Sequence, residues 1–516
     1  MRKSAALVHA PGGARPQRAL LFATAALAAL GLLLRGLQYA FDQALWFDEA
    51  RNAFEILKPG WREWLPPHVQ QPVPIGFLLV ERGVASVASN SEWSLRALPF
   101  AASLATLVVA ARLARRHLEG VAVPLAVGLV ALSGPAIYFA AELKPYASDG
   151  LVFLGFAGLW LRFSTVEAPS ARAWAGLALA GVLAPWFSYS AVFPMAVLGS
   201  LLFAENIRRG DFRGGLALIA VGTCWLVSFA FHYGIAIAAW RDTGWLNLHW
   251  QATFPAAGAG LAVLAGWGFD AFVAAFRSPL GLGTGAAWVA AAAFVLGSLR
   301  AWRDGERLLL FFVACIALVF ACGLLGLYPF EKRLLLFVLP ALAFPVAHGI
   351  AWLPGRGLRV LGAVAIAVWL LAHPASMALG LLDGRPIHGS GHTHFPGGYE
   401  GLRPVLPGLQ AQWRQGDRIH LYHGAEPEFR YYARRAGFDA PFTVGERSVG
   451  APEGYRAELD ALAGEARVWV VFAHPIPAER KLFLEHLDTM GERLDSITSP
   501  LADAHLYDLR GTPRQP

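Results

Sequence analysis

Charged residues are scarce in this chain. Only 15% of its 516 residues are Asp, Glu, Lys or Arg, whereas ordinary soluble domains carry about 25%. Hydrophobic residues make up 56%, and the mean hydropathy is +0.46. A soluble globule has no place to bury so much apolar side chain, because a large part of any globule is surface. The composition also excludes a disordered chain, and it therefore indicates a polytopic membrane protein.

Cysteine and lysine are also rare. The three cysteines, Cys224, Cys315 and Cys322, all lie in apolar stretches, which excludes a disulfide framework and a CxxC metal site. There are only five lysines, and the arginines that give a net charge of +7 are scattered in short groups between apolar runs. This distribution is typical of membrane topology signals and not of a nucleic-acid-binding face.

Apolar runs predict about eleven membrane-spanning helices, each of about 20 residues. They lie near 19–41, 95–114, 121–140, 150–164, 174–188, 189–204, 216–238, 282–299, 308–327, 334–353 and 360–382. The basic N-terminus precedes a long first run without a convincing cleavage site, so we expect an uncleaved first span. The stretch 72–89 carries Glu81 and Arg82 at its middle, which favours a membrane-surface helix over a span.

The positions of the arginines indicate which loops between the predicted spans face the cytoplasm. With the N-terminus inside, every predicted inner loop is short and carries arginine. These residues are Arg2, Arg15 and Arg18; Arg112, Arg115 and Arg116; Arg162 and Arg172; Arg208, Arg209 and Arg213; Arg300, Arg303 and Arg307; and Arg356 and Arg359. A span at 72–89 would break the pattern. We therefore expect a multi-pass protein with a cytoplasmic N-terminus and a C-terminal segment on the outer side. The preference for Arg over Lys and the high Ala content are typical of a GC-rich bacterium, so the expected membrane is a bacterial inner (cytoplasmic) membrane and the C-terminal segment would be periplasmic.

The composition changes after Leu382, where charged residues, His, Pro and Gly become common. Strand-like runs at 418–423, 467–473, 493–497 and 504–509 alternate with helical runs at 428–436 and 478–490, which predicts a small α/β domain. The expected domains are a transmembrane domain at 1–382, with outer loops at 42–94, 141–149, 239–281 and 328–333, and a periplasmic α/β domain at 383–516.

Three outer loops combine acids with polar or cationic residues. They read Trp-Phe-Asp-Glu-Ala-Arg-Asn at 46–52, Glu-Leu-Lys-Pro-Tyr-Ala-Ser-Asp at 142–149 and Tyr-Pro-Phe-Glu-Lys-Arg at 328–333. Ionisable groups at a bilayer are expensive and usually face a cavity. A carboxylate can activate a hydroxyl as a general base, and Lys or Arg can hold a phosphate. Two structural explanations compete with this: Asp48-Glu49 could cap an interfacial helix, and the acids and cations of the other loops could pair with each other.

The loop motifs resemble those of the GT-C glycosyltransferases, in particular the protein O-mannosyltransferases and lipid A aminoarabinose transferases. The acidic pair Asp48-Glu49 resembles the Asp-Glu motif of their first outer loop. The elements at 142–149 and before Arg333 are similar to a bacterial, mannosyltransferase-like branch. One departure is the segment His68-Val-Gln-Gln-Pro, where relatives often carry His-Pro-Pro.

This resemblance implies an enzyme that takes a sugar from a polyprenyl-phosphate donor and passes it, with inversion, to an acceptor on the periplasmic face. The acceptor could be a glycolipid, a polysaccharide or a protein. Asp48, with Glu49 beside it, would be the base or the carboxylate that orients the acceptor. The donor phosphate would contact Lys144, Tyr146, Lys332 and Arg333. The sugar or acceptor would contact Glu142, Asp149, His68 and Tyr328.

The sequence predicts no dedicated metal site, although Asp48, Glu49 and Glu142 could hold a divalent cation such as Mg²⁺ or Mn²⁺. Three histidines at 388, 392 and 394 are better explained as part of a linker. Two other functions stay open. A transporter or flippase of a lipid-linked or anionic substrate would explain the spans, but it usually carries midplane charges and internal repeats, which are not visible here. A membrane anchor for a binding domain would not need charged outer loops. No nucleic-acid partner is expected.

Overall fold

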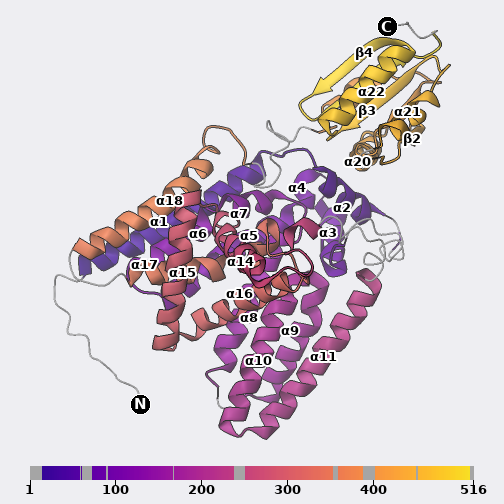
Figure 1. The fold of residues 1–516 in the computed structure, drawn as a ribbon. Coiled ribbons are helices and arrows are strands. Elements are labelled where there is room, and N and C mark those ends of the chain that lie inside the picture. The colour runs from indigo at the N-terminus through magenta and orange to yellow at the C-terminus, as the bar shows by residue number, and fades with distance from the viewer. Residues whose placement is uncertain are drawn as a thin grey trace. The chain divides into compact units, whose positions relative to one another are not determined.

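A computed structural model describes residues 14–58, 60, 72–88, 91–166, 168–237, 250–352, 358–387, 401–448 and 451–511. The chain divides into two compact units (Figure 1). The helical unit comprises Met1–Phe41, Pro72–Val80 and Arg96–Gly391. The sheet unit comprises Asp42–Gln71, Glu81–Leu95 and His392–Pro516, so that it includes the predicted first outer loop together with the C-terminal segment.

Helices stand at all eleven positions where spans are predicted. They are α1 (Ala14–Ala40), α5 (Ala97–His117), α6 (Ala122–Ala131) with α7 (Gly134–Tyr138) and η2 (Phe139–Ala141), α8 (Tyr146–Phe163), α9 (Ala171–Phe187), η3 (Tyr189–Ala191) with α10 (Val192–Arg209), α11 (Phe212–Ala236), α15 (Thr284–Asp304), α16 (Arg307–Leu324), η5 (Lys332–Val338) with α17 (Leu339–Ala351), and α18 (Leu358–Leu379). Among the described residues, eight helices are long and apolar enough to cross a membrane, or nine if the pair α6–α7, bent by 53°, forms one span. The polytopic helical fold is confirmed.

The region 239–281, predicted as an outer loop, contains η4 (Gln251–Thr253) and the 17-residue apolar helix α14 (Leu261–Arg277). The second half of this predicted outer loop therefore contains a helix that was not expected from the sequence. The stretch 72–89 forms α3 (Ile75–Ala88), whose 14 residues are too few for a span of about 20.

Two glycines allow α15 and α17 to pack closely. A Cβ atom at Gly297 would lie 1.9 Å from the Pro345 carbonyl oxygen, and one at Gly349 would lie 2.0 Å from that of Ala293. Small residues let membrane helices approach in this way. Both clashes involve backbone atoms, so the two helices must separate to accept any side chain.

Gly297→Ala is therefore expected to destabilise the protein by about 1–3 kcal/mol, the usual cost of overpacking. The measurement is thermal unfolding in detergent. Gly222→Ala is the matched control, because a Cβ at Gly222 meets nothing within 4 Å. Equal unfolding temperatures for the two variants would contradict the close packing.

The sheet unit contains a five-stranded sheet in the order β2-β1-β3-β5-β4. Its strands are β1 (Arg418–Leu421), β2 (Phe442–Val444), β3 (Val468–Ala473), β4 (Glu492–Ser499) and β5 (Ala502–Asp508). Its helices are α2 (Phe47–Leu57), α4 (Glu92–Leu95), α19 (Val405–Gln412), α20 (Glu426–Ala436), α21 (Pro452–Asp460) and α22 (Pro477–Met490). The first three strands in sequence are parallel, and β5 runs antiparallel to both β3 and β4.

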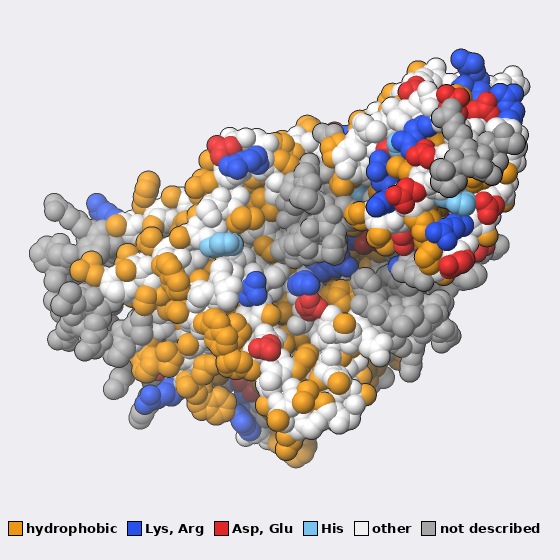
Figure 2. Space-filling model, turned by 45° about the horizontal axis from the view of Figure 1, so that its top comes forward, with side chains coloured by type: hydrophobic (Ala, Val, Ile, Leu, Met, Phe, Trp, Pro, Cys, Tyr) orange, Lys and Arg blue, Asp and Glu red, His pale blue; other side chains and the backbone are white. Residues whose placement is uncertain are grey.

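The predicted α/β character of the C-terminal segment is thus confirmed. Strand β3 is buried along its whole length, as its unbroken apolar sequence requires for a central strand covered on both faces. In the face drawn in Figure 2, charged side chains are dense on the C-terminal sheet domain and sparse among the apolar side chains of the helical unit. This contrast follows the change of composition after Leu382.

Candidate active site

The acidic pair of the first loop lies at the start of α2, in the sheet unit. Glu49 is buried, and its Oε2 accepts a hydrogen bond from the backbone N–H of Trp46 at 3.0 Å. This is the backward-reaching half of a capping box. Asp48 is partly buried, and its charge acts on Arg51, one turn further along the helix. The capping explanation therefore holds for Glu49, whereas Asp48 stays a candidate for chemistry.

Arg51 contributes a cation beside Asp48. Its guanidinium carbon lies 4.1 Å from the centre of the Phe47 ring. Burial lowers the pKa of Arg51, and the charges of Asp48 and Glu426 act against this shift. A partly desolvated cation next to a carboxylate stabilises the ionised form of that carboxylate, which is the form that a general base requires.

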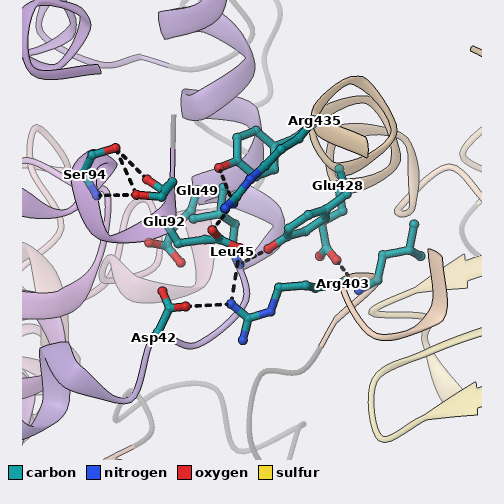
Figure 3. Close-up of polar contacts among 12 residues, drawn as sticks. Asp42, Leu45, Glu49, Glu92, Ser94, Arg403, Glu428 and Arg435 are labelled. Atoms are coloured by element: carbon teal, nitrogen blue, oxygen red, sulfur yellow. Dashed lines mark hydrogen bonds and ion pairs between the residues drawn. The ribbon is translucent and has the colours of Figure 1, made fainter. Parts of the chain in front are cut away.

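Helix α20 packs along α2 and holds the segment before it (Figure 3). The backbone N–H of Leu45 donates to the hydroxyl of Tyr432 at 2.8 Å. The Trp46 ring contacts the His474 ring, with centroids 4.4 Å apart, and His474 pairs with the buried Glu428. Residues separated by almost 400 positions in the chain thus fix where α2 begins and how Asp48 is presented.

A buried carboxylate joins the same elements. Glu92 accepts hydrogen bonds from Arg435 and, at 3.3 Å, from Arg403, which also donates to Asp42 at 3.2 Å (Figure 3). Burial alone would raise the pKa of Glu92, but a backbone hydrogen bond and the two arginines lower it below its ordinary value. The carboxylate is therefore charged in the folded protein and links three segments of the sheet unit.

Glu92→Gln is expected to cost about 2 kcal/mol of stability at pH 7, because it removes charge-assisted hydrogen bonds. Since the folded pKa of Glu92 is depressed, this contribution is fully present above the ordinary value of 4.5 and is lost as the pH falls through the folded pKa. Thermal unfolding between pH 7 and pH 3 should therefore show the two proteins converging in acid. Glu465→Gln, which breaks an exposed ion pair with Arg418, should have little effect; an equal effect would contradict the prediction.

The second loop lies in the helical unit, directly before α8. Glu142, Lys144 and Asp149 are all buried. Glu142 accepts a hydrogen bond from Tyr138, and the Lys144 backbone N–H donates to the Glu142 carbonyl oxygen at 2.7 Å. The Tyr146 ring contacts Phe139 at 5.0 Å. The alternative of an exposed ion pair between Glu142 and Lys144 does not fit this burial.

Tyr328 of the third loop lies near Asp149 and Tyr146 of the second loop. Tyr328 is half-buried, and its hydroxyl donates to the Leu334 carbonyl oxygen at 2.9 Å. Desolvation of the hydroxyl raises the pKa of Tyr328, as do the neighbouring Asp149 and Tyr146. Arg333 lies 5.7 Å from the Trp250 ring centre. The remaining cation of this loop, Lys332, is mostly exposed and pairs with its neighbour Glu331 at 2.6 Å.

Lys332 also lines a cavity of about 350 Å³ within the helical unit. Its walls are largely apolar, including Leu282, Phe330 and Met377, and its polar members include Arg277 and His373. Sequence reasoning missed these last two residues. Arg277 ends the unexpected helix α14, and the only signal was a lone cation at the end of an apolar run. An apolar cavity with cationic members suits a phosphorylated lipid.

Some of the residues singled out in the sequence are not among those that the structure describes. His68 and the histidines at 388, 392 and 394 are not among the described residues. Within the described ranges, no group of three or more His, Cys, Asp or Glu side chains is arranged to hold a metal ion. Of the predicted site residues, Glu142, Lys144, Tyr146, Asp149, Tyr328, Lys332 and Arg333 belong to the helical unit, and Asp48 and Glu49 to the sheet unit.

Comparison of the fold identifies similar membrane proteins. No family model matches the sequence, and no curated protein matches it. Among solved structures, apo ArnT from Cupriavidus metallidurans matches with a TM-score of 0.56 and 12% identity over 93% of this chain and 97% of that one. The same protein bound to undecaprenyl phosphate matches with a TM-score of 0.53, 14% identity and the same coverage.

Mycobacterial arabinofuranosyltransferase AftD matches with a TM-score of 0.51 and 14% identity over 95% of this chain and 40% of that one. The archaeal oligosaccharyltransferase AglB from Archaeoglobus fulgidus matches with a TM-score of 0.50 and 12% identity over 94% of this chain and 74% of that one. These likenesses extend over nearly the whole chain, so the fold is that of the GT-C glycosyltransferases. The fold expected from the loop motifs is confirmed.

Proposed function

We propose that this protein is a membrane glycosyltransferase that moves a sugar from a polyprenyl-phosphate donor to an acceptor on the periplasmic face of a bacterial inner membrane. The observation that carries the proposal is the coexistence, within a GT-C fold, of buried acids and a lysine in the second loop with an apolar cavity that includes Lys332 and Arg277. This combination suits a ligand with a hydrocarbon chain and a charged head. ArnT, which shares the fold, has been solved with undecaprenyl phosphate bound.

The proposed roles follow from charge. Lys144, Tyr146, Lys332 and Arg333 bind the donor phosphate, since charge-assisted hydrogen bonds to phosphate are strong and stabilise it as a leaving group. Arg277 adds a further cation to the cavity that Lys332 lines. Glu142, Asp149, His68 and Tyr328 contact the sugar or the acceptor. The acceptor is a glycolipid, a polysaccharide or a protein with a free hydroxyl or amine.

The proposed reaction is a single displacement. Asp48 orients the acceptor and takes its proton, the acceptor atom forms a bond to the anomeric carbon, and the bond from that carbon to the phosphate oxygen breaks. The electron pair of the broken bond leaves with polyprenyl phosphate. Attack from the face opposite the phosphate inverts the anomeric configuration. The charges of Arg51 and Asp48 interact across one turn of α2, so that a cation stands beside the proposed base.

The test uses the purified full chain in detergent with a panel of radiolabelled polyprenyl-phosphate hexoses and pentoses and a cell-envelope extract as the source of acceptors. Loss of label from the lipid, with gain of label in the extract, is the expected result for at least one donor. A second experiment, with the protein reconstituted in vesicles, tests the alternative that it is a transporter. Movement of intact donor across the bilayer without loss of label would contradict a transferase and support a transporter.

A further inference from the structure

Buried polar groups without partners gather at one end of the helical unit. His232 on α11 is fully buried, and neither of its ring nitrogens has a hydrogen-bond partner among the described residues. The same is true, within those residues, of the buried hydroxyl of Tyr189 in η3 and of Oδ1 of Asp149 on α8. All three lie near the helix ends opposite two arginine-bearing turns, the one between α8 and α9, with Arg162 and Arg172, and the one between α10 and α11, with Arg208, Arg209 and Arg213.

These three side chains are neighbours. The His232 ring lies 5.4 Å from the Tyr189 ring and 4.7 Å from the Trp186 ring, centre to centre. Ser188, directly before η3, is within hydrogen-bonding reach of Asp149, and η3 packs against α8. The surrounding polar groups are satisfied, since Trp186 donates to Ser228 at 3.0 Å and the Ser188 and Ser190 hydroxyls bond to each other at 3.0 Å.

Such a cluster lowers the stability of the protein when no ligand is bound. A buried polar group without a partner costs about 1–3 kcal/mol, and nearly all such groups in folded proteins are paired. Ionisable groups within a membrane domain mark functional sites by default. The unpaired atoms of His232 and Tyr189, whose rings are in contact, and Oδ1 of Asp149 on the helix that packs against η3 therefore point to a ligand that supplies the missing hydrogen bonds.

The chemistry of the cluster selects the ligand. An imidazole, a phenol and a carboxyl group offer donors and acceptors to hydroxyl groups, and Trp186 offers an aromatic wall. None of the three is a cation, so the cluster is unsuited to a phosphate, which the lysines and arginines can hold. We propose that His232, Tyr189 and Asp149 form the subsite for the sugar ring of the donor. This proposal rests on the proposed function and assigns two new residues, His232 and Tyr189, to sugar recognition.

Two ligands that differ only in the sugar test the proposal. Binding of undecaprenyl phosphate, and of the glycosylated lipids of the panel above, is measured by the thermal shift of the full chain in detergent. His232→Phe and Tyr189→Phe remove the polar atoms and keep the ring. Tyr233→Phe, one residue further on α11, is the matched control. Both variants should bind undecaprenyl phosphate as the wild type does and should bind the glycosylated lipid about 10-fold more weakly, with KM raised and kcat little changed.

Stability separates a ligand site from a structural role. Because the variants remove unpaired polar atoms, their unfolding temperature without ligand should equal or exceed that of the wild type. A lowered unfolding temperature would show that the side chains are satisfied in the folded protein and would overturn the proposal. Equal weakening of both lipids would also overturn it, because the cluster would then recognise the phosphate or the chain.

The wild-type protein distinguishes failure of the subsite from failure of the proposed function. If it binds the glycosylated lipids tightly but transfers no sugar, the proposed function fails while the sugar subsite stands. If it binds no glycosylated lipid more tightly than undecaprenyl phosphate, the subsite fails.

Discussion

Asp48→Asn is expected to lower the rate of sugar transfer by about 10³-fold, in the range that general bases contribute. The amide keeps the size and the helix-start position of the side chain but cannot accept a proton. Membrane insertion and unfolding temperature should stay unchanged, since the backbone before α2 is held by Tyr432 and Glu49. The measurement is the initial rate of label transfer at saturating donor.

Glu49→Gln is the matched control within the same turn. The glutamine side chain can still accept a hydrogen bond from the Trp46 backbone N–H, as Gln does in a capping box. We therefore expect transfer near the wild-type rate if Glu49 serves only as a cap. Losses of equal size in both variants would assign the chemistry to the acidic pair, and wild-type transfer by Asp48→Asn would contradict the assignment of the first loop.

Lys144→Ala is expected to raise KM for the lipid donor about 30-fold, which corresponds to about 2 kcal/mol for a lost charge-assisted contact with phosphate. Lys144 is buried, and the loop 142–149 contains no second Lys or Arg that could replace its ammonium group. The effect should appear equally with undecaprenyl phosphate as a competitive inhibitor, because that ligand retains the phosphate.

Lys481→Ala removes an exposed lysine of α22 and controls for the loss of one positive charge. A second comparison uses donors with different sugars. Lys144→Ala should weaken all of them by a similar factor, whereas His232→Phe should discriminate among them. If Lys144→Ala changed the preference among sugars and left undecaprenyl phosphate binding intact, the lysine would belong to the sugar subsite and not to the phosphate site.

Most of the helical architecture could be predicted because membrane spans are local features. A run of about 20 apolar residues must form a helix in lipid to satisfy its own backbone, and arginines between the runs indicate the turns. The same argument did not predict α14, a 17-residue helix within the stretch 239–281 that we had expected as an outer loop. In the sheet unit, β2 and α21 escaped prediction because three residues of strand and a weakly apolar helix carry little periodic signal.

The candidate site could be predicted only as a set of loops. Composition identified Asp48-Glu49 and the acid–cation groups at 142–149 and 328–333, but not their partners. The capping role of Glu49 was one of two possible explanations, and the structure supports it through one hydrogen bond to Trp46. Arg277, Tyr189 and His232 gave no specific sequence signal, since an isolated polar residue at the end of an apolar run is common.

By itself, the sequence determined that this is a polytopic membrane protein with a C-terminal α/β segment, because hydropathy and backbone hydrogen bonding act over a few turns of chain. Only the tertiary structure decided which buried polar groups are paired. Tyr432 reaches Leu45 across 387 positions, and His232 meets Tyr189 from another helix without finding a hydrogen-bond partner among the described residues. Pairing of buried polar groups depends on elements that are distant in sequence, and for this reason the polar cluster that we assign to the donor sugar became visible only in three dimensions.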